Sequence, residues 1–447
     1  MDSLIVGSNR KIDPSRRKHL DGLLKPDNTP DDNDRVEIGP TQLAFDEWAA
    51  AGLTAPDMPA LREYRLSRLQ DQIKKHDVAG LLLFDPLNIR YATDTTNMQL
   101  WTAHNAARAC FVPAEGKVIL WDFHNCEHLS AHLPLVGELR GGASFFYFET
   151  GDQTEKHAQH FADTMLEIMQ KYAGSNKRLA VDKMENAGYA ALVQRGVEVL
   201  DGQVLTEHAR SIKNANEINA MRCAIHACEM AVDEMRAAMV PGVTENDIWA
   251  ALHAGNIKRG GEWIETRILA SGPRTNPWFQ ECGPRVIEAG DMLAFDTDLV
   301  STYGYCCDIS RSWIVGDVTP TAEQKTLYQI AYEHVMTNME LIKPGMSFNE
   351  VTEKAHRLPE AYRALRYGVL AHGIGLCDEY PSIRYPEDVA EHGYGGVVEV
   401  GMTLCVEAYI GAVGGREGVK LEEQVLVTEN GCVPLSTYPY ETDLLAS

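Results

Sequence analysis

The sequence predicts an α+β protein of two domains, with an α/β domain in the N-terminal half and a catalytic domain after it. The chain has 447 residues, about three times the ~150 residues expected of one domain. Helical and strand patterns alternate as far as residue 205, as in α/β domains. Beyond it, helical segments are followed by strands that carry carboxylates. We therefore expect an N-terminal arm over residues 1–58, a first domain over 59–205 and a second over 206–447.

The first domain is expected to begin with a helix and a buried strand. Apolar residues spaced for one helix face predict a helix over 59–77, and the apolar run at 78–84 predicts the strand. Asp85-Pro86 then predicts a turn. A long helix is expected over 154–172, with further strands at 109–112, 117–122 and 178–182.

The second domain is expected to begin with two helices and to continue with strands. The helices cover 216–239 and 244–259, and Thr244 and Asp247 have the spacing of an N-terminal capping pair. Two later helices are predicted over 322–342 and 347–361. Strands are predicted at 266–271, 291–300 and 305–315 and within 397–427.

The composition argues against several classes of protein. A formal net charge of −23 disfavours binding to a nucleic-acid backbone or an anionic membrane surface. The sequence contains no run of about 18 apolar residues and no secretion signal at its start. The ten cysteines include no Cys-x-x-Cys pair, so we expect reduced thiols in a cytoplasmic protein.

Acidic residues on the strands of the second domain are the main chemical signal. Asp296 and Asp298 are one residue apart in a predicted strand, so their side chains should share a face. Surface acids on half-exposed strands are the alternative interpretation. Because buried carboxylates are costly unless paired or bound to metal, so many acids with aliphatic neighbours favour two divalent metal ions. The other candidates are Asp308 in a second strand, His372 in a glycine-rich turn, and Glu407 and Glu422 in apolar strands.

This series resembles the pita-bread family of metalloaminopeptidases, prolidases and creatinase-like enzymes, over about residues 60–435. Supporting motifs are Gly304-Tyr-x-x-Asp308-x-x-Arg311 and Gly418-x-Lys-x-Glu422, and Asp85-Pro-Leu-Asn-Ile-Arg-Tyr91 is similar to the creatinase N-terminal domain. The resemblance implies a creatinase-type α/β domain followed by a pita-bread catalytic domain, and a homodimer. It implies that the metal ligands are Asp296, Asp308, His372, Glu407 and Glu422.

Three positions depart from the pattern of the family's peptidases. The position eleven residues before Gly290, a histidine in those peptidases, is Phe279. Asp378 takes the place of their second histidine, and Asp298 replaces a glycine two residues after the first ligand. These changes on a complete ligand set are similar to the DddP-type dimethylsulfoniopropionate lyases. That branch implies an iron-dependent elimination that converts a small zwitterionic sulfonium into dimethyl sulfide and acrylate.

The resemblance also implies roles for individual side chains. Asp378 is the expected base, and a loop carboxylate that caps a turn is the alternative interpretation. Asp298 is either a sixth ligand or a second candidate base. Tyr367 either supports the substrate carboxylate, or acts in acid–base chemistry, or is a core residue. Arg311 is expected to hold a ligand carboxylate.

Aromatic residues are expected to bind the sulfonium, because it has no N–H to donate and cations bind to ring faces. The candidates are Trp101, Trp278 and Phe279, and ordinary packing is the stronger interpretation for Trp101, unless it reaches the site across a dimer. A prolidase-like dipeptidase is the alternative function, with a non-catalytic binding protein after it. Manganese, cobalt and zinc are alternatives to iron.

Overall fold

The computed structural model describes residues 39–123, 126, 129–130 and 133–446, and the backbone of two short strands, β1 (Ile5–Val6) and β2 (Arg10–Lys11). The chain forms two compact units. Most of the arm expected before residue 39 lies outside the described residues. Its last part contains helix α2 (Gln42–Ala50), which belongs to the same unit as Ser211–Ser447.

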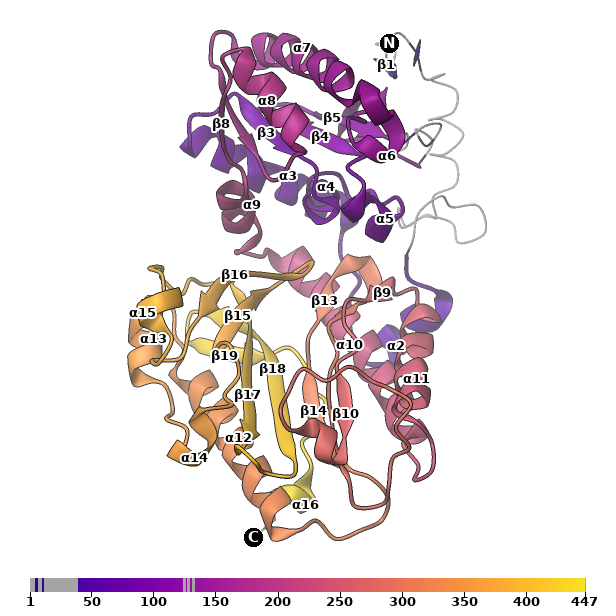
Figure 1. Ribbon diagram of the computed structural model, residues 1–447, viewed down its shortest axis with the longest axis vertical. Helices are drawn as coiled ribbons and strands as arrows, with labels where there is room; N and C mark the ends of the chain where they lie inside the picture. The colour runs from indigo at the N-terminus through magenta and orange to yellow at the C-terminus, as the bar shows by residue number, and fades with distance from the viewer. Residues whose placement is uncertain are drawn as a thin grey trace. The chain divides into compact units, whose positions relative to one another are not determined.

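The first unit is a six-stranded sheet with helices on both faces. Figure 1 shows α7 (Thr154–Ala173) and α8 (Asn186–Gln194) on one face, and α3 (Met58–Lys75) and α4 (Pro86–Thr93) on the other. Phe111 and Ile119 of the sheet share an apolar cluster with Phe161 and Met165 of α7. The strand order is β6-β5-β4-β3-β7-β8, formed by β3 (Gly80–Leu83), β4 (Ala109–Val112), β5 (Val118–Asp122), β6 (Val136–Gly141), β7 (Arg178–Val181) and β8 (Glu198–Asp201). The predicted α/β domain is confirmed.

The turn predicted at Asp85-Pro86 is instead the start of helix α4. The Asp85 side chain accepts a hydrogen bond from the backbone N–H of Leu87, and Pro86 is the first helical residue. Aspartate before a helix and proline in its first turn are both favoured. The prediction was wrong because the same two residue types also begin turns.

The second unit contains antiparallel sheets. The larger one has the order β16-β15-β17-β18-β19, with β15 (Ala371–Ile374), β16 (Asp378–Ile383), β17 (Thr403–Gly411), β18 (Gly418–Thr428) and β19 (Gly431–Pro434). A second sheet joins β10 (Leu269–Ser271), β11 (Met292–Asp296) and β14 (Ser310–Ile314). A third joins β9 (Trp263–Ile264), β12 (Leu299–Val300) and β13 (Cys306–Cys307).

Long helices cover these sheets (Figure 1). Helix α12 (Ala322–Leu341) packs on β17 and β18 through an apolar cluster that includes Leu327, Val335 and Leu421. Helices α10 (Ala215–Ala238) and α11 (Glu245–Ile257) pack against each other. The capping pair predicted at the start of α11 is confirmed. The elements together form the predicted second domain, in which helices pack on antiparallel sheets.

Three local predictions in this unit were wrong. The strand expected over 291–300 breaks after Asp296, and Asp298 has a φ of 36°. His372 lies in strand β15 rather than in a turn, because its neighbour Gly373 permits close contact with the backbone of β16. The helix expected to reach residue 361 ends at Lys354 as α13 (Phe348–Lys354), and a separate helix, α14 (Glu360–Arg363), begins after Pro359. Pro359 prevents one continuous helix, because the residue that precedes a proline disfavours helical backbone.

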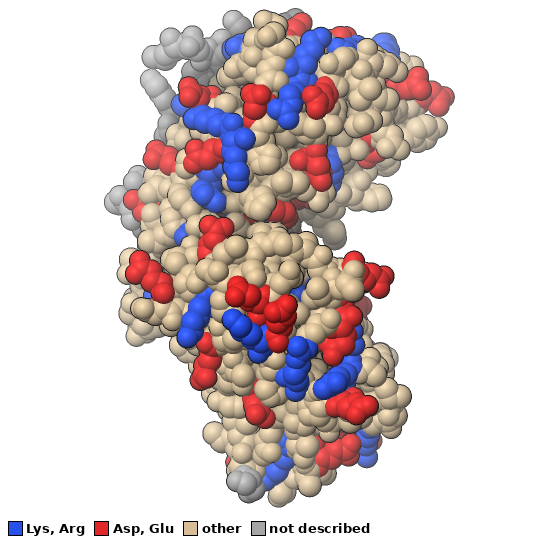
Figure 2. Space-filling model, turned by 90° about the vertical axis from the view of Figure 1, so that its left-hand side faces the viewer, with Lys and Arg blue, Asp and Glu red and all other residues tan. Residues whose placement is uncertain are grey.

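Charges on the visible surface are mixed. On the face shown in Figure 2, Lys and Arg side chains are interspersed with Asp and Glu. The net negative charge of the sequence is thus not gathered into one continuous acidic area on that face. Among the described residues, no helix is long and apolar enough to cross a membrane.

Candidate metal centre

Strand alternation brings the candidate ligands of the larger sheet to one side. Glu407 on β17 lies directly opposite Glu422 on β18, and His372 on β15 lies opposite Cys405 on β17. Cys405 precedes Glu407 by two residues and therefore shares its face. Only 1% of Glu407 and 0% of Glu422 is exposed, so these carboxylates lie in the interior.

His372 stands among three carboxylates. Its Nε2 lies 3.5 Å from Asp308 Oδ2, 3.5 Å from Glu407 Oε1 and 3.4 Å from Glu422 Oε1. Its Nδ1 lies 3.0 Å from the carbonyl oxygen of Gly373. Donation from Nδ1 to that carbonyl leaves the Nε2 lone pair facing the acids, as in histidines that bind metal.

Asp296 and Asp298 approach from the end of β11 and the turn that follows. Asp296 Oδ1 accepts a hydrogen bond from Ser310 Oγ at 2.6 Å. Asp298 Oδ2 accepts one from Thr266 Oγ1 at 2.7 Å. Asp298, Asp308 and Asp378 each have one carboxylate oxygen within 4.8 Å of the others. The break in the strand thus places Asp298 close to Asp308 and Asp378.

Several oxygens of these acids have no hydrogen-bond donor within the described chain. They are Asp308 Oδ1, Glu407 Oε1 and Glu422 Oε1. One ligand atom from each of Asp308, His372, Cys405 and Glu422 also lies within 4.8 Å of the others. Buried carboxylate oxygens without donors are costly. A cluster of such oxygens around one imidazole fits divalent metal ions, so the donor set agrees with the metal site expected from the sequence.

Lys420 belongs to this cluster and was missed by sequence reasoning. Its Nζ lies 2.8 Å from Asp296 Oδ2, 2.9 Å from Glu407 Oε2 and 2.7 Å from Glu422 Oε2. The residue is fully buried and compensates part of the negative charge. Lys420 precedes Glu422 by two residues on β18, so the same alternation that places Glu422 also indicates Lys420.

Crowding and burial shift the pKa values of the acids. Burial, followed by the charge of Glu422, raises the pKa of Asp308 well above its usual range. Burial opposes ionisation of Glu422 too, but Lys420 and His372 outweigh it and hold the pKa of Glu422 well below the usual range. Burial also raises the pKa of Asp378, although 56% of that side chain is exposed. A reachable carboxylate with a raised pKa is suited to accept a proton.

Asp378 is the first residue of strand β16 rather than part of a loop. Its Oδ1 lies 3.7 Å from His372 Nδ1. The next residue, Glu379, is buried and pairs with Lys213. The start of β16 is therefore fixed by a buried ion pair while the Asp378 side chain stays accessible.

Two of the predicted aromatic residues lie beside Lys420, and a third packs on one of them. Its Nζ lies 4.5 Å from the ring centroid of Tyr367 and 5.8 Å from that of Trp278. Phe279 packs on Tyr367 with ring centroids 5.4 Å apart, is 62% exposed, and has a φ of 69°. A bulky residue at such a φ is strained, and strain of this kind clusters at functional sites. Burial raises the pKa of Tyr367, so its hydroxyl stays protonated.

Two further predicted residues are Trp101 and Arg311. Trp101 belongs to helix α5 (Gln99–His104) of the first unit, and its ring packs against Phe123 at 5.3 Å. Arg311 does not hold a ligand carboxylate, so that prediction was wrong. Its Nη2 donates to Glu423 Oε2 at 2.9 Å and its Nη1 donates to the backbone carbonyl of Glu422 at 2.6 Å. Arg311 follows Ser310 on β14 and therefore faces the other side of the strand.

Known proteins match both units of the chain. Residues 65–212 match the creatinase/prolidase N-terminal domain, and residues 219–429 match metallopeptidase family M24. The chain is 54% identical over 441 residues to dimethylsulfoniopropionate lyase DddP of Roseovarius nubinhibens, covering 98% of each protein. It is 51% identical over 443 residues to that of Roseobacter denitrificans, again covering 98% of each.

Solved structures show the same fold at lower identity. A Xaa-Pro dipeptidase from Bacillus anthracis superimposes with a TM-score of 0.66 at 23% identity, covering 84% of this chain and 98% of that one. At that identity the likeness concerns the fold alone, whereas the two lyases match along nearly the whole sequence. The chain therefore belongs to the DddP dimethylsulfoniopropionate lyase family, which is built on the creatinase and M24 metallopeptidase fold.

Proposed function

We propose that this protein is a metal-dependent carbon–sulfur lyase that cleaves dimethylsulfoniopropionate into dimethyl sulfide and acrylate. The observation that carries the proposal is the carboxylate of Asp378 beside a full set of oxygen and imidazole ligands. The near full-length likeness to two DddP lyases supports it. An acid next to the ligands suits proton removal from carbon. Two of the three departures from the peptidase pattern, Phe279 and Asp378, replace histidines and so disfavour hydrolysis.

The proposed cofactor is a pair of divalent metal ions. When bound, they stabilise the negative charge that develops on the substrate carboxylate as the neighbouring C–H ionises. Iron is the proposed metal, with manganese, cobalt and zinc as alternatives, because an oxygen-rich site with one imidazole accepts all four. Elemental analysis of the purified protein distinguishes them. The residues that would hold the metal are Asp296, Asp298, Asp308, His372, Glu407 and Glu422.

The chemical step needs a base and no water. The Asp378 carboxylate takes a proton from the carbon next to the substrate carboxylate. The C–H electron pair forms the carbon–carbon double bond, and the C–S pair leaves with the sulfur as neutral dimethyl sulfide. Acrylate and a protonated Asp378 remain, and loss of that proton to solvent resets the site. Asp298 is the competing candidate base, but its Oδ2 already accepts a hydrogen bond from Thr266.

The sulfonium is best held by aromatic surface. Phe279 offers the most accessible ring, with 62% of the residue exposed. Trp278 and Tyr367 have a cation, Lys420, within 5.8 and 4.5 Å of their ring centroids. Repulsion between that ammonium and the sulfonium would direct the sulfonium toward Phe279. Attraction would direct the substrate carboxylate toward the side of the cluster that carries Lys420.

We further propose that the protein is a homodimer of the cytoplasm. The dimer follows from the family resemblance, and light scattering on the purified protein measures it. The location is supported by the ten cysteines, which are all free thiols, as expected in a reducing compartment. Trp101 remains a predicted substrate contact. An unchanged KM in a Trp101→Ala variant would show that Trp101 does not contact the substrate.

The proposed reaction is tested with the purified, metal-loaded protein and dimethylsulfoniopropionate. Headspace analysis should detect dimethyl sulfide, and proton NMR should detect acrylate in equal amount. The same preparation should leave Xaa-Pro dipeptides intact. Dipeptide hydrolysis without dimethyl sulfide would favour the prolidase-like alternative, whereas neither activity in a metal-loaded sample would favour a binding protein.

A further inference from the structure

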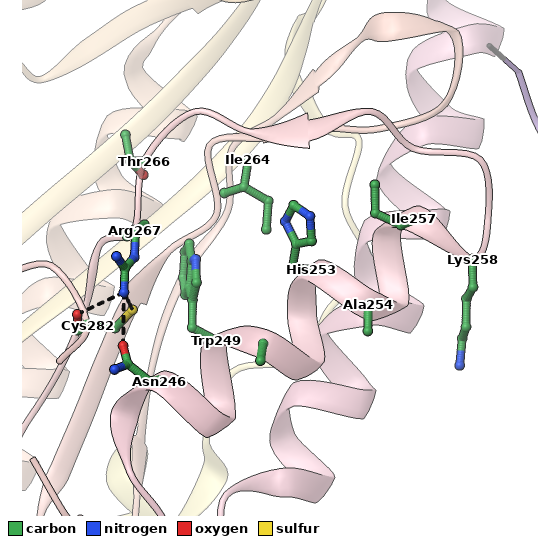
Figure 3. Close-up of a pocket in the computed structure, with 11 residues that line it drawn as sticks. Asn246, Trp249, His253, Ala254, Ile257, Lys258, Ile264, Thr266, Arg267 and Cys282 are labelled. Carbon is green, nitrogen blue, oxygen red and sulfur yellow. Dashed lines mark hydrogen bonds between the residues drawn. The ribbon is translucent and has the colours of Figure 1, made fainter. Parts of the chain in front are cut away.

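The second unit contains a pocket distinct from the candidate metal centre. It lies between helix α11 and the segment that carries β9, and Figure 3 shows His253 and Ile264 pointing into it. Its volume is about 970 Å³, which is in the range of small-molecule sites. Trp249 provides an aromatic wall. None of the proposed metal ligands is among the described residues that line it.

The polar groups of this pocket are neutral or cationic. They come from Asn246, His253, Lys258, Thr266, Arg267 and Cys282, and the described lining includes no Asp or Glu. A lining that offers cations and neutral donors but no carboxylate complements an anion. Lys258 pairs with Glu234 at 2.6 Å, and in Figure 3 its side chain runs away from His253. Arg267 is therefore the cation that would meet an anion.

Arg267 is held in a fixed orientation. Its Nη2 donates to Asn246 Oδ1 at 2.9 Å and to the Cys282 carbonyl at 3.4 Å, and lies 3.3 Å from Cys282 Sγ (Figure 3). These bonds use one corner of the guanidinium. Because a guanidinium has donors on all three nitrogens, its other edge suits a carboxylate.

One residue connects the pocket to the candidate metal centre. Thr266 lines the pocket, and its Oγ1 donates to Asp298 Oδ2 at 2.7 Å. Asp298 is a proposed metal ligand or base. A ligand that shifts Thr266 would therefore change the hydrogen bonding of a carboxylate in the catalytic cluster.

We propose that this pocket binds a small monocarboxylate with a short apolar body. Its carboxylate would contact Arg267, and its hydrocarbon part would pack on the neighbouring Trp249 and Ile264. Binding of this class of ligand does not depend on the reaction. A second part rests on the proposed function: acrylate, the product, belongs to this class, so that the pocket gives product inhibition through Thr266.

Binding is tested on the full-length, metal-loaded protein by calorimetric titration with propionate and with its neutral isostere propionamide. Propionate should bind with a Kd of about 1 mM, as expected for so small a ligand, and propionamide at least about tenfold more weakly. Arg267→Met should weaken propionate binding about tenfold. Lys258→Met removes a cation of the same pocket that is already paired, and should leave the affinity unchanged.

The affinity of propionate for the metal centre would not change with Arg267→Met. The loss of propionate binding that this substitution causes therefore measures binding in the pocket. Equal binding by wild type and Arg267→Met, or equal binding of propionamide, would overturn the proposal. The coupling is tested separately: propionate should inhibit dimethyl sulfide release without competing with substrate, and Thr266→Val should abolish the inhibition but not the binding. Absence of any lyase activity would remove the coupling and leave the carboxylate site intact.

Discussion

Glu422 and Glu423 are neighbours on strand β18, but they belong to buried charged clusters of different kinds. Glu423 Oε2 accepts hydrogen bonds from Arg311 at 2.9 Å and from Tyr440 at 3.1 Å. The Arg311 guanidinium also lies 4.2 Å from the centroid of the Tyr440 ring. The other donors of Arg311 are used by backbone carbonyls, among them those of Glu422 and Tyr438.

The side of the strand that carries Glu422 is not balanced in this way. One lysine and one histidine face four acids, Asp296, Asp308, Glu407 and Glu422. Glu423 also has one oxygen without a donor, but it has the Arg311 guanidinium to itself. The comparison shows how two kinds of buried acid differ. An acid with partners within the chain stabilises the fold, whereas a group of acids without enough partners indicates a ligand from outside it.

The same substitution on the two sides of the sheet should have opposite consequences. Glu407→Gln keeps the shape of the side chain and removes one negative charge from the crowded side. We expect metal binding to weaken by at least about 100-fold, since even groups that only support a ligand are worth up to that much. Because the change also relieves repulsion, the metal-free variant should melt no lower than metal-free wild type.

Metal titration of wild type and Glu407→Gln measures the change in metal affinity, and calorimetry of the two metal-free proteins measures the change in melting temperature. A Glu407→Gln variant that kept its metal, or that melted far lower without it, would assign Glu407 to the fold instead.

Glu423→Gln is the matched change on the balanced side. It leaves the buried Arg311 guanidinium without its ionised partner, which should cost about 3 kcal/mol of unfolding free energy. Metal content and dimethyl sulfide release at a temperature below the transition should remain near those of wild type. Denaturant unfolding gives the stability change, and a loss of metal without loss of stability would contradict the comparison.

His334 is a buried group of a third kind, which stays uncharged. Burial, followed by repulsion from His356, lowers its pKa to about 3, and its ring stacks on Tyr385 with centroids 5.7 Å apart. Because the unfolded chain takes up this proton near pH 6.5 and the folded chain does not, the stabilising contribution is complete above pH 6.5. It should decline by at most about 1.4 kcal/mol per pH unit as the pH falls toward 3.

Thermal unfolding of wild type and His334→Gln between pH 7 and pH 5 measures this contribution. The variant should show a shallower loss of stability on acidification. Parallel curves for the two proteins would show that His334 does not carry the effect.

The smallest expected effect concerns Phe279, whose ring is largely exposed. Phe279→Ala should raise KM for dimethylsulfoniopropionate about two- to fivefold, because a cation on an exposed ring gains about 0.5–1 kcal/mol. The kcat and the metal content should change little. A fall in kcat with unchanged KM would place Phe279 outside the sulfonium contact.

The sequence was sufficient for the fold. The resemblance, rather than any periodicity, grouped Glu407 with Glu422, and the pairing of β17 with β18 places the two residues opposite each other. Alternation failed at Asp298, because the strand ends after Asp296 and no local signal marks that break. Lys420 could have been found by the same rule, but a lysine on a strand is usually exposed, and its burial depends on three acids from distant segments.

Arg311 illustrates a second limit. Its place in a family motif near a ligand suggested contact with a ligand carboxylate, whereas its position directly after Ser310 puts it on the other face of β14. Its partners Glu423 and Tyr438 are more than a hundred residues away. Such pairings depend on the packing of β14 against β18, which sequence periodicity does not contain.

The most direct test of the account replaces the proposed base alone. Asp378→Asn keeps the size of the side chain and removes its ability to take a proton. With metal content equal to that of wild type, the variant should release dimethyl sulfide at least about 100-fold more slowly, as expected for loss of a general base. Release at the wild-type rate by a fully loaded Asp378→Asn protein would contradict the account.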